Sequence, residues 1–246
     1  IRDSVNSFVS KNEDLILANA TAPLQSAAAA TTDIPILGTS VTDYATALDI
    51  SDWSGTTGRN ISGTSDLAPL SEQAAMLNEL FPDAKNVGLL YCSAEANSQY
   101  QIDVIKEELE KLNYTCTAYS FVDSNDIASV VQSAVNDNDV LYVPTDNTAA
   151  SNTEVINNIA GEAGVPIIAG EAGICKGCGV ATLSISYYDL GYQTGKMAYE
   201  ILVNGADPST MEVEFAPAVT KQYNPDICEK LGITVPDDYK ALDMSE

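Results

Sequence analysis

Short apolar runs alternate with amphipathic stretches along most of the chain, and a small polar loop often follows an apolar run. In residues 139–151 (DVLYVPTDNTAAS), the run 140–143 predicts a strand that stops at Pro144, and a helix opens at Ala149. In open α/β sheets, ligands bind at loops that follow the carboxyl ends of strands. The free N–H groups of a first helical turn suit an anion such as a carboxylate. Residues 145–148 are therefore a candidate ligand-binding loop.

The same strand–loop–helix–strand pattern occurs twice, first in residues 15–40 and again in residues 140–171. In both copies a proline, Pro35 or Pro166, lies at the beginning of the second strand, where a missing N–H is tolerated. Because the pattern occurs only twice, it predicts two similar lobes and not a long repeat array.

The rest of the pattern continues the alternation of strands and helices. Helices are predicted at residues 1–12, 69–80, 99–112, 126–135, 188–202 and 225–231, and strands at residues 86–91, 115–121, 180–184 and 211–215. Residues 41–60 are loop-like, and residues 61–66 look like a segment that leaves the first lobe. Such alternation predicts an α/β fold with parallel sheets flanked by helices.

Charge and composition narrow the function. The chain of 246 residues carries a net charge of −24, which argues against nucleic acid and against charge-driven docking on anionic lipid. It contains no histidine, so Ser-His-Asp and Cys-His catalysis and the usual His-ligated metal sites are excluded. No apolar run is long enough to span a bilayer. We expect no catalytic residue, no metal ligand and no cofactor.

Five cysteines are present, and Cys175 and Cys178 form a C-x-x-C pair. The pair lies in a Gly-rich stretch that we interpret as a loop, whereas a thioredoxin-type pair would begin a helix after a strand. A zinc knuckle would need a second pair of ligands, which the sequence does not offer. A local disulfide and two free thiols both remain open.

Three segments together resemble the ABC-transporter substrate-binding proteins of the tryptophan/tyrosine-binding type. They are residues 86–98 (NVGLLYCSAEANS), 142–148 (YVPTDNT) and 187–197 (YYDLGYQTGKM), and the resemblance covers residues 12–242. It implies a type I periplasmic-binding fold with two α/β lobes, three crossings and a ligand cleft between the lobes.

The resemblance also implies where the lobes lie. The N-terminal lobe would comprise residues 1–65 plus 187–206, and the C-terminal lobe residues 66–186 plus 207–246. Family members begin with a signal and an additional strand–helix–strand, which this chain lacks, so we expect the first lobe to be incomplete at its start. We further expect an extracytoplasmic, monomeric protein, lipid-anchored through a missing N-terminal Cys, that serves an ABC permease.

A free aromatic amino acid, Trp, Tyr or Phe, is the ligand that this resemblance favours. Its carboxylate needs N–H and hydroxyl donors, and its ammonium needs a carboxylate, for which Asp189 is the first choice because it opens a helix after a crossing strand. Asp146 and Glu171 are the other choices. The candidate ligand-binding residues are Ala20, Thr21, Ser40, Thr42, Asp43, Glu95, Asn97, Thr145, Asp146, Asn147, Thr148, Glu171, Tyr188 and Asp189.

Structural roles compete with each of these assignments. Asp189 and Thr21 are also good helix caps, and Asp146 and Asn147 are good turn residues. Glu171 could face water, and one of the adjacent Tyr187 and Tyr188 is expected to be structural.

Two other functions stay open alongside amino-acid binding. One is an α/β enzyme that acts on a small polar metabolite at the strand ends, although neither a phosphate-binding loop nor a nucleophile elbow is present. The other is a ligand-binding domain of a sensor or regulator.

Overall fold

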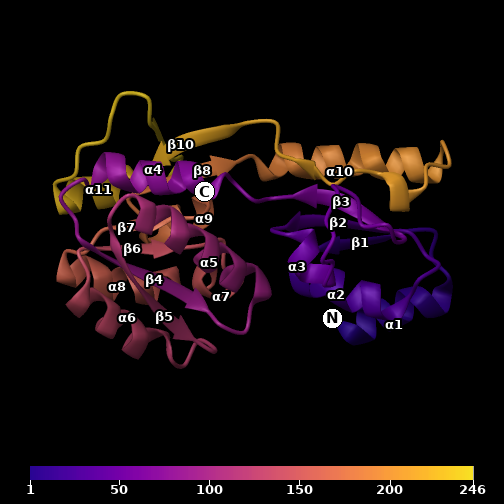
Figure 1. Cartoon of the computed structure of the whole chain (residues 1–246), viewed down its shortest axis with the longest axis horizontal. Helices are drawn as coiled ribbons and strands as arrows, with labels where there is room; N and C mark the ends of the chain where they lie inside the picture. Colours follow the sequence, from indigo (N-terminus) through magenta and orange to yellow (C-terminus); the bar gives the residue numbers. More distant parts are fainter. Residues whose placement is uncertain (246) are drawn as a thin grey trace. The chain divides into compact units, whose positions relative to one another are not determined.

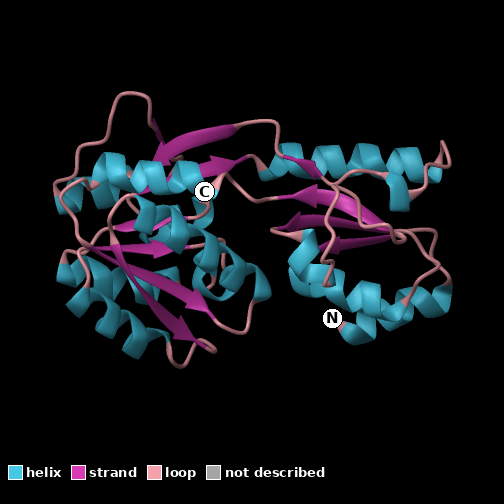
Figure 2. Ribbon diagram, viewed as in Figure 1, coloured by secondary structure: helices cyan, strands magenta, loops and turns pink. Residues whose placement is uncertain are grey.

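The computed structural model describes residues 1–245, which form two compact units. Unit 1 comprises Ile1–Leu67 and Ser186–Ala218, and unit 2 comprises Ala68–Ile185 and the chain from Val219 onward. Each unit is an α/β structure with helices on both faces of one sheet (Figures 1 and 2). No helix of the described chain is long and apolar enough to cross a membrane.

Unit 1 contains a four-stranded parallel sheet in the order β1-β2-β3-β9. Its strands are β1 (Ile16–Asn19), β2 (Ile36–Val41), β3 (Ile61–Ser65) and β9 (Glu214–Phe215). Its helices are α1 (Arg2–Lys11), α2 (Thr21–Ala30), α3 (Tyr44–Leu48) and α10 (Tyr187–Leu202), with the short 3-10 helix η1 (Pro208–Thr210).

The two faces of this sheet are covered by different parts of the chain. On one face, α1, α2 and α3 bury a cluster that includes Leu24, Ile36 and Ile61. On the other face, α10 packs Met197 and Ile201 against Leu37 of β2. Figure 1 shows α10 and α2 on opposite sides of the sheet. Because α10 follows residues 68–185 of unit 2 in the sequence, unit 1 is complete only when the chain comes back to it after residue 185.

A tyrosine hydroxyl lies against two glycines in the middle of this sheet. Tyr44 is buried and its hydroxyl donates to the carbonyl oxygen of Thr64 over 3.2 Å. An added Cβ at Gly38 or at Gly63 would lie 2.3 Å from the Tyr44 hydroxyl oxygen, and Gly63 has a φ of +145°. The close approach of β2, β3 and α3 therefore requires both glycines.

Unit 2 contains a seven-stranded sheet in the order β11-β10-β8-β7-β6-β4-β5, in which β10 runs antiparallel to β8. Its strands are β4 (Asn86–Cys92), β5 (Thr115–Phe121), β6 (Val140–Val143), β7 (Ile167–Ala169), β8 (Ala181–Ile185), β10 (Val219–Tyr223) and β11 (Lys240–Ala241). Its helices are α4 (Leu70–Leu80), α5 (Ala96–Lys111), α6 (Ile127–Asp137), α7 (Asn147–Ala150), α8 (Thr153–Ala163), α9 (Ala172–Cys178) and α11 (Pro225–Leu231).

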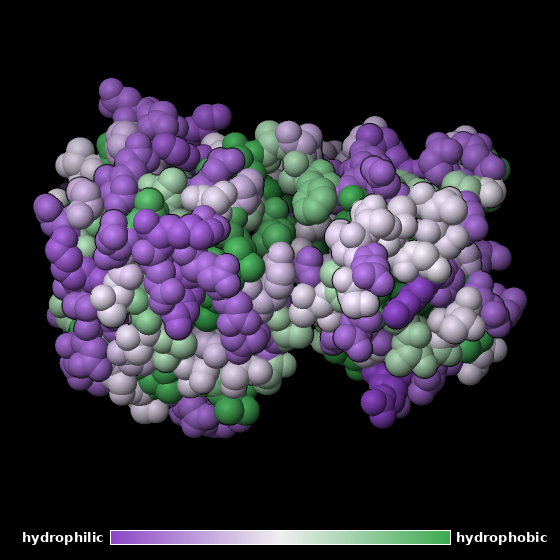
Figure 3. All heavy atoms as spheres, viewed as in Figure 1, coloured by the Kyte–Doolittle hydropathy of each residue, from purple (hydrophilic) through white to green (hydrophobic). Residues whose placement is uncertain are grey.

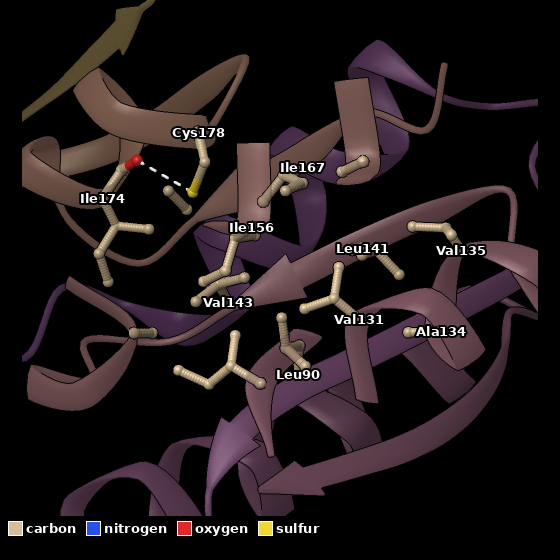
Figure 4. Close-up of a cluster of buried hydrophobic side chains, with 14 of the residues drawn as sticks. Leu90, Val131, Ala134, Val135, Leu141, Val143, Ile156, Ile167, Ile174 and Cys178 are labelled. Atoms are coloured by element: carbon tan, nitrogen blue, oxygen red, sulfur yellow. Dashed lines mark hydrogen bonds between the residues drawn. The ribbon is translucent and has the colours of Figure 1, made fainter. Parts of the chain in front are cut away.

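The central strands read as continuous hydrophobic runs because both of their faces are buried, and the apolar core under α6, α8 and α9 covers one of them. Leu90, Leu141 and Val143 from β4 and β6 meet Val131 and Ile156 from the covering helices, and all five are fully buried (Figure 4). Polar residues are concentrated outside, and Figure 3 shows hydrophilic side chains over much of the visible face of unit 2.

The structure corrects three expectations from the sequence. Residues 41–60 contain α3, and the Cys175/Cys178 pair lies in the helix α9 and not in a loop. Both helices are short, so their periodicity is hard to detect. Residues 207–218 belong to unit 1 and not to the C-terminal lobe, because β9 pairs with β3.

All five cysteines of the described chain are free thiols, and Cys175 and Cys178 lie in the core of unit 2. The Cys178 thiol donates to the Ile174 carbonyl oxygen over 3.4 Å (Figure 4), and burial raises its pKa to about 12. Burial also raises the pKa of Cys175 well above its ordinary value. Both thiols are therefore protonated at neutral pH and unreactive.

Replacing Gly63 with Ala should destabilise the protein, because the new Cβ would lie 2.0 Å from the Gly38 carbonyl oxygen. We expect a loss of about 2–4 kcal/mol in unfolding free energy, measured by urea denaturation. Gly191→Ala is the matched control, since no atom lies within 4 Å of its added Cβ, and it should stabilise α10 by about 0.5–1 kcal/mol. Equal stability of the two variants would contradict the packing described for Gly63.

Candidate ligand-binding site

Glu95 organises the strand-end loops of unit 2. It follows β4, and its carboxylate accepts four hydrogen bonds from the start of α7. Asn147 donates through its backbone N–H over 3.0 Å and its side-chain amide over 2.8 Å. Thr148 donates through its N–H over 2.9 Å and its hydroxyl over 2.7 Å. Burial opposes ionisation of Glu95, but these bonds outweigh it and the pKa is lowered.

Asp146 is also committed to internal hydrogen bonds. It is buried at the N-terminus of α7 and accepts from the N–H groups of Ala149, over 2.8 Å, and of Cys92, over 2.7 Å. Burial, with the nearby charge of Glu95, raises the pKa of Asp146. The side chain thus fastens the end of β4 to the start of α7, and both of its oxygens already have donors.

Glu171 has the same role at the next strand. It follows β7 and its carboxylate accepts from the N–H groups of Gly173, over 2.6 Å, and of Ile174, which caps α9. Its side chain does not simply face water, and burial raises its pKa. All three acidic candidates of unit 2 are therefore bound to the N-terminal ends of unit 2 helices.

Buried glutamines, which the sequence interpretation missed, hold the loop after β6. The side-chain amide of Gln101 forms two bonds of 3.0 Å with Thr145, donating to its carbonyl oxygen and accepting from its N–H. Asn97 donates to the same carbonyl oxygen over 3.1 Å. Gln73 accepts from the Tyr142 hydroxyl over 2.5 Å and donates to the Gly170 carbonyl oxygen over 3.4 Å.

A signal for these residues exists in the sequence. Asn97 and Gln101 occupy the buried stripe of α5 that Ile105 and Leu109 continue. A polar side chain at an apolar position of an amphipathic helix must find partners in the interior.

In unit 1, the loops after β1 and β2 present hydroxyls that the described chain leaves without internal hydrogen bonds. They belong to Thr21, Ser40 and Thr42. The residues Ala20 and Ser40 have positive φ angles of 83° and 53°, which are uncommon for residues other than glycine. Such strained backbone positions cluster at ligand-binding sites.

These loops lie side by side. Asn19 of β1 pairs with Thr39 of β2, and the Ala20 N–H donates to the Thr39 carbonyl oxygen over 2.9 Å. The helix α2 begins there without a side-chain cap, since Ala20 stands at its N-cap position. Asp43, by contrast, caps α3 by accepting from the Thr46 N–H over 2.7 Å.

The start of α10 lies at the same edge of the sheet. Thr194, in its second turn, hydrogen-bonds the hydroxyls of Thr39, over 3.2 Å, and Thr64, over 2.8 Å. Five residues earlier, about 7.5 Å along the helix, stands Asp189. Ser186 caps the helix by accepting from the Asp189 N–H over 3.1 Å, so Asp189 is not the cap itself.

The two adjacent tyrosines at this helix start differ in role. The Tyr187 hydroxyl donates to the buried Asp66 carboxylate over 3.1 Å and joins α10 to the end of β3. Tyr188 is 81% exposed. The carboxylate of Asp189 is exposed and makes no hydrogen bond or ion pair within the described chain.

No group of three or more His, Cys, Asp or Glu side chains in residues 1–245 is arranged to hold a metal ion. Among the sequence-predicted site residues, those of unit 2 form internal hydrogen bonds, and the hydroxyls and the carboxylate without such bonds belong to unit 1.

Comparison with known proteins decides the family. The model of the family described as ABC transporter substrate binding protein matches residues 2–244. The chain belongs to this family. Substrate-binding proteins of ABC transporters are extracytoplasmic. The chain's fold agrees with the type I periplasmic-binding fold of solved relatives.

Three relatives are informative. A tyrosine-binding protein of Clostridioides difficile (strain R20291) is 37% identical over 195 residues, which cover 79% of this chain and 56% of the relative. The ABC domain from Streptococcus pneumonia in complex with L-Trp superposes with a TM-score of 0.91 at 30% identity, covering 98% of this chain and 85% of the other. The ligand-free, open structure of CD0873 from Clostridium difficile gives 0.75 at 35% identity, covering 99% and 83%.

More distant likenesses show the fold alone. A sugar transporter from Clostridium phytofermentans superposes with a TM-score of 0.61 at 12% identity, covering 91% of this chain and 81% of the other. Because the match to the curated relative spans only 56% of its length, the substrate and partners of this substrate-binding protein are matters for proposal.

Replacing Gln101 with Glu should disturb the loop after β6 in a pH-dependent way. At pH 8 the carboxylate can no longer donate to the Thr145 carbonyl oxygen, and we expect a loss of about 2 kcal/mol in unfolding free energy. The neutral acid has one donor and one acceptor, so it can restore both bonds to Thr145, although not the amide's second donation, over 3.1 Å, to the Asn97 carbonyl oxygen. The folded-state pKa of the new carboxyl is thus raised above its unfolded value of about 4.3.

A raised folded-state pKa contributes stability below the unfolded value and loses it as pH rises through the folded value. The difference from the original protein should therefore shrink toward pH 4, which chemical denaturation across pH can measure. Gln132→Glu, on the exposed side of α6, is the control and should differ little at any pH. A pH-independent deficit in Gln101→Glu would contradict the two-bond arrangement.

Proposed function

We propose that this protein is the solute-binding component of an ABC importer and that it binds a free amino acid, which it releases unaltered. The observation that carries the proposal is the set of uncommitted groups at one edge of the unit 1 sheet. Hydroxyl and N–H donors stand after β1 and β2, and the carboxylate of Asp189 stands at the start of α10. A zwitterion needs both kinds of group.

The ligand's carboxylate is assigned to the loops after β1 and β2. The first N–H groups of α2 have no capping side chain to satisfy them, and a carboxylate is the natural partner for such groups. The hydroxyls of Thr21, Ser40 and Thr42 add donors of the kind that a carboxylate accepts. Asp43 is assigned a supporting role, because its carboxylate is already used to cap α3.

The ligand's ammonium is assigned to Asp189. Asp146 and Glu171 were the alternatives, but both accept hydrogen bonds from helix N–H groups within unit 2. The carboxylate of Asp189 accepts no such hydrogen bond and is exposed. Its neighbour Tyr188 offers an exposed ring for an aromatic side chain.

An aromatic amino acid is the substrate class that the relatives support. One is named a tyrosine-binding protein, and another was solved in complex with L-Trp. The family further supports handover to a membrane permease. We also propose a monomer that a lipid anchors at the outer face of the membrane, an arrangement that rests on the family resemblance alone.

Replacing Asp189 with Ala should weaken binding of Tyr, Trp or Phe by about 1.5–3 kcal/mol, the usual value of a hydrogen bond to a charged group. Titration calorimetry measures this directly. Asp226→Ala is a matched control, because Asp226 also lies exposed in the first turn of a helix, α11, that another side chain caps. 3-Phenylpropanoate, which lacks the ammonium, should bind Asp189→Ala and the original protein alike. Unchanged affinity for Phe would remove Asp189 from the site.

Replacing Thr21 or Thr42 with Val should weaken binding of an amino acid about tenfold, because one donor to the carboxylate is lost. Tyramine lacks the carboxylate, so neither change should alter its affinity. Thr32→Val serves as control, since Thr32 is exposed and precedes β2. If calorimetry shows equal losses for tyrosine and tyramine, the carboxylate is bound elsewhere.

A further inference from the structure

The hydrogen-bond donors that surround the Glu95 carboxylate in unit 2 form a carboxylate-binding site, which we call the Glu95 seat. Two backbone N–H groups, one amide and one hydroxyl surround a single carboxylate at distances of 2.7–3.0 Å. Both donor residues, Asn147 and Thr148, are candidate ligand-binding residues from the sequence. The protein's own side chain occupies them instead.

The hydrogen bonds to Glu95 keep its carboxylate ionised, and the negative charge at these loops repels a second anion. The four hydrogen bonds lower the pKa of Glu95 despite its partial burial. Burial raises the pKa of Asp146, and the nearby charge of Glu95 raises it further. The loops after β4, β6 and β7, residues 93–98, 144–148 and 170–172, contain no Lys or Arg to offset these charges.

We propose that Glu95 is a specificity-determining residue that reserves the loops of unit 2 against anionic ligand groups. This inference rests on the proposed amino-acid binding function. An anionic group of a ligand at these loops would find the donors of Asn147 and Thr148 already bonded to Glu95, and the negative charge of Glu95 would repel it. The side chains of neutral amino acids are not excluded in this way, whereas the side-chain carboxylates of aspartate and glutamate are.

Removing the Glu95 carboxylate should therefore open an anion-binding seat. In Glu95→Ala the two N–H groups, the amide and the hydroxyl lose their acceptor, and a small carboxylate can replace it. We expect sodium acetate to raise the melting temperature of Glu95→Ala with a saturable dependence, relative to sodium chloride at equal ionic strength. The original protein and Glu107→Ala, which removes an exposed carboxylate from α5 in the same unit, should show no such difference.

The variant should also select ligands differently. Calorimetry with all twenty amino acids should show the affinity of Glu95→Ala for aspartate and glutamate rising relative to phenylalanine by about tenfold or more, the value of one charged hydrogen bond. Glu95→Gln keeps one acceptor oxygen and directs an NH2 group at the opposing donors, so its shift should be smaller than that of Glu95→Ala.

Each outcome bears on the inference. Saturable stabilisation by acetate supports it, as does a Glu95→Ala variant that folds only when acetate is present. Absence of any acetate effect, or an amino-acid ranking unchanged from that of the original protein, overturns it. If the original protein binds no amino acid, the proposed function fails, and the acetate experiment still shows whether the seat exists.

Discussion

The N–H groups at the beginning of a helix need an acceptor, and this constraint governs both units. Where a helix follows a strand, the protein can supply the acceptor itself or leave the groups for a ligand. In unit 2 it supplies Glu95 and Asp146 at α7 and Glu171 at α9. In unit 1 it supplies Asp43 at α3 but no side chain at α2. The start of α5 in unit 2 also lacks a side-chain cap, so the difference applies to the loops after β6 and β7 of unit 2 and the loop after β1 of unit 1.

Much of the fold was predictable because the central strands are buried on both faces and carry unbroken apolar runs. Strand β6 has the predicted bounds, and β4 ends one residue later than predicted. The edge strand β5 and the helix α11 also have the predicted bounds, and α10 begins one residue earlier than predicted. The short helices α3 and α9 were missed because five or seven residues hold too little periodicity. β9 was assigned to the wrong unit because its pairing with β3 joins residues far apart in sequence, which no local pattern reports.

The sequence predicted the loops of the candidate site but not the hydrogen bonds that their residues form within the protein. A polar loop after a strand marks the place, yet the donors of Asn147 and Thr148 would look the same whether they served Glu95 or a ligand. Only the structure shows which partner is present. The position of Gln101 on the buried stripe of α5 indicates that it needs partners in the interior, but the sequence does not identify them because they are backbone groups of Thr145.

The late return of the chain to unit 1 has a consequence for how the protein is made. During synthesis, β1, β2 and β3 emerge first, but the helix α10 that covers Leu37 follows only after the whole of residues 68–185. Until then, one apolar face of the nascent sheet has no cover of its own, although domains made early usually fold as units. A ribosome-bound chain that ends before residue 187 should therefore attract chaperones to residues 1–67, while the central segment already has most of its own core.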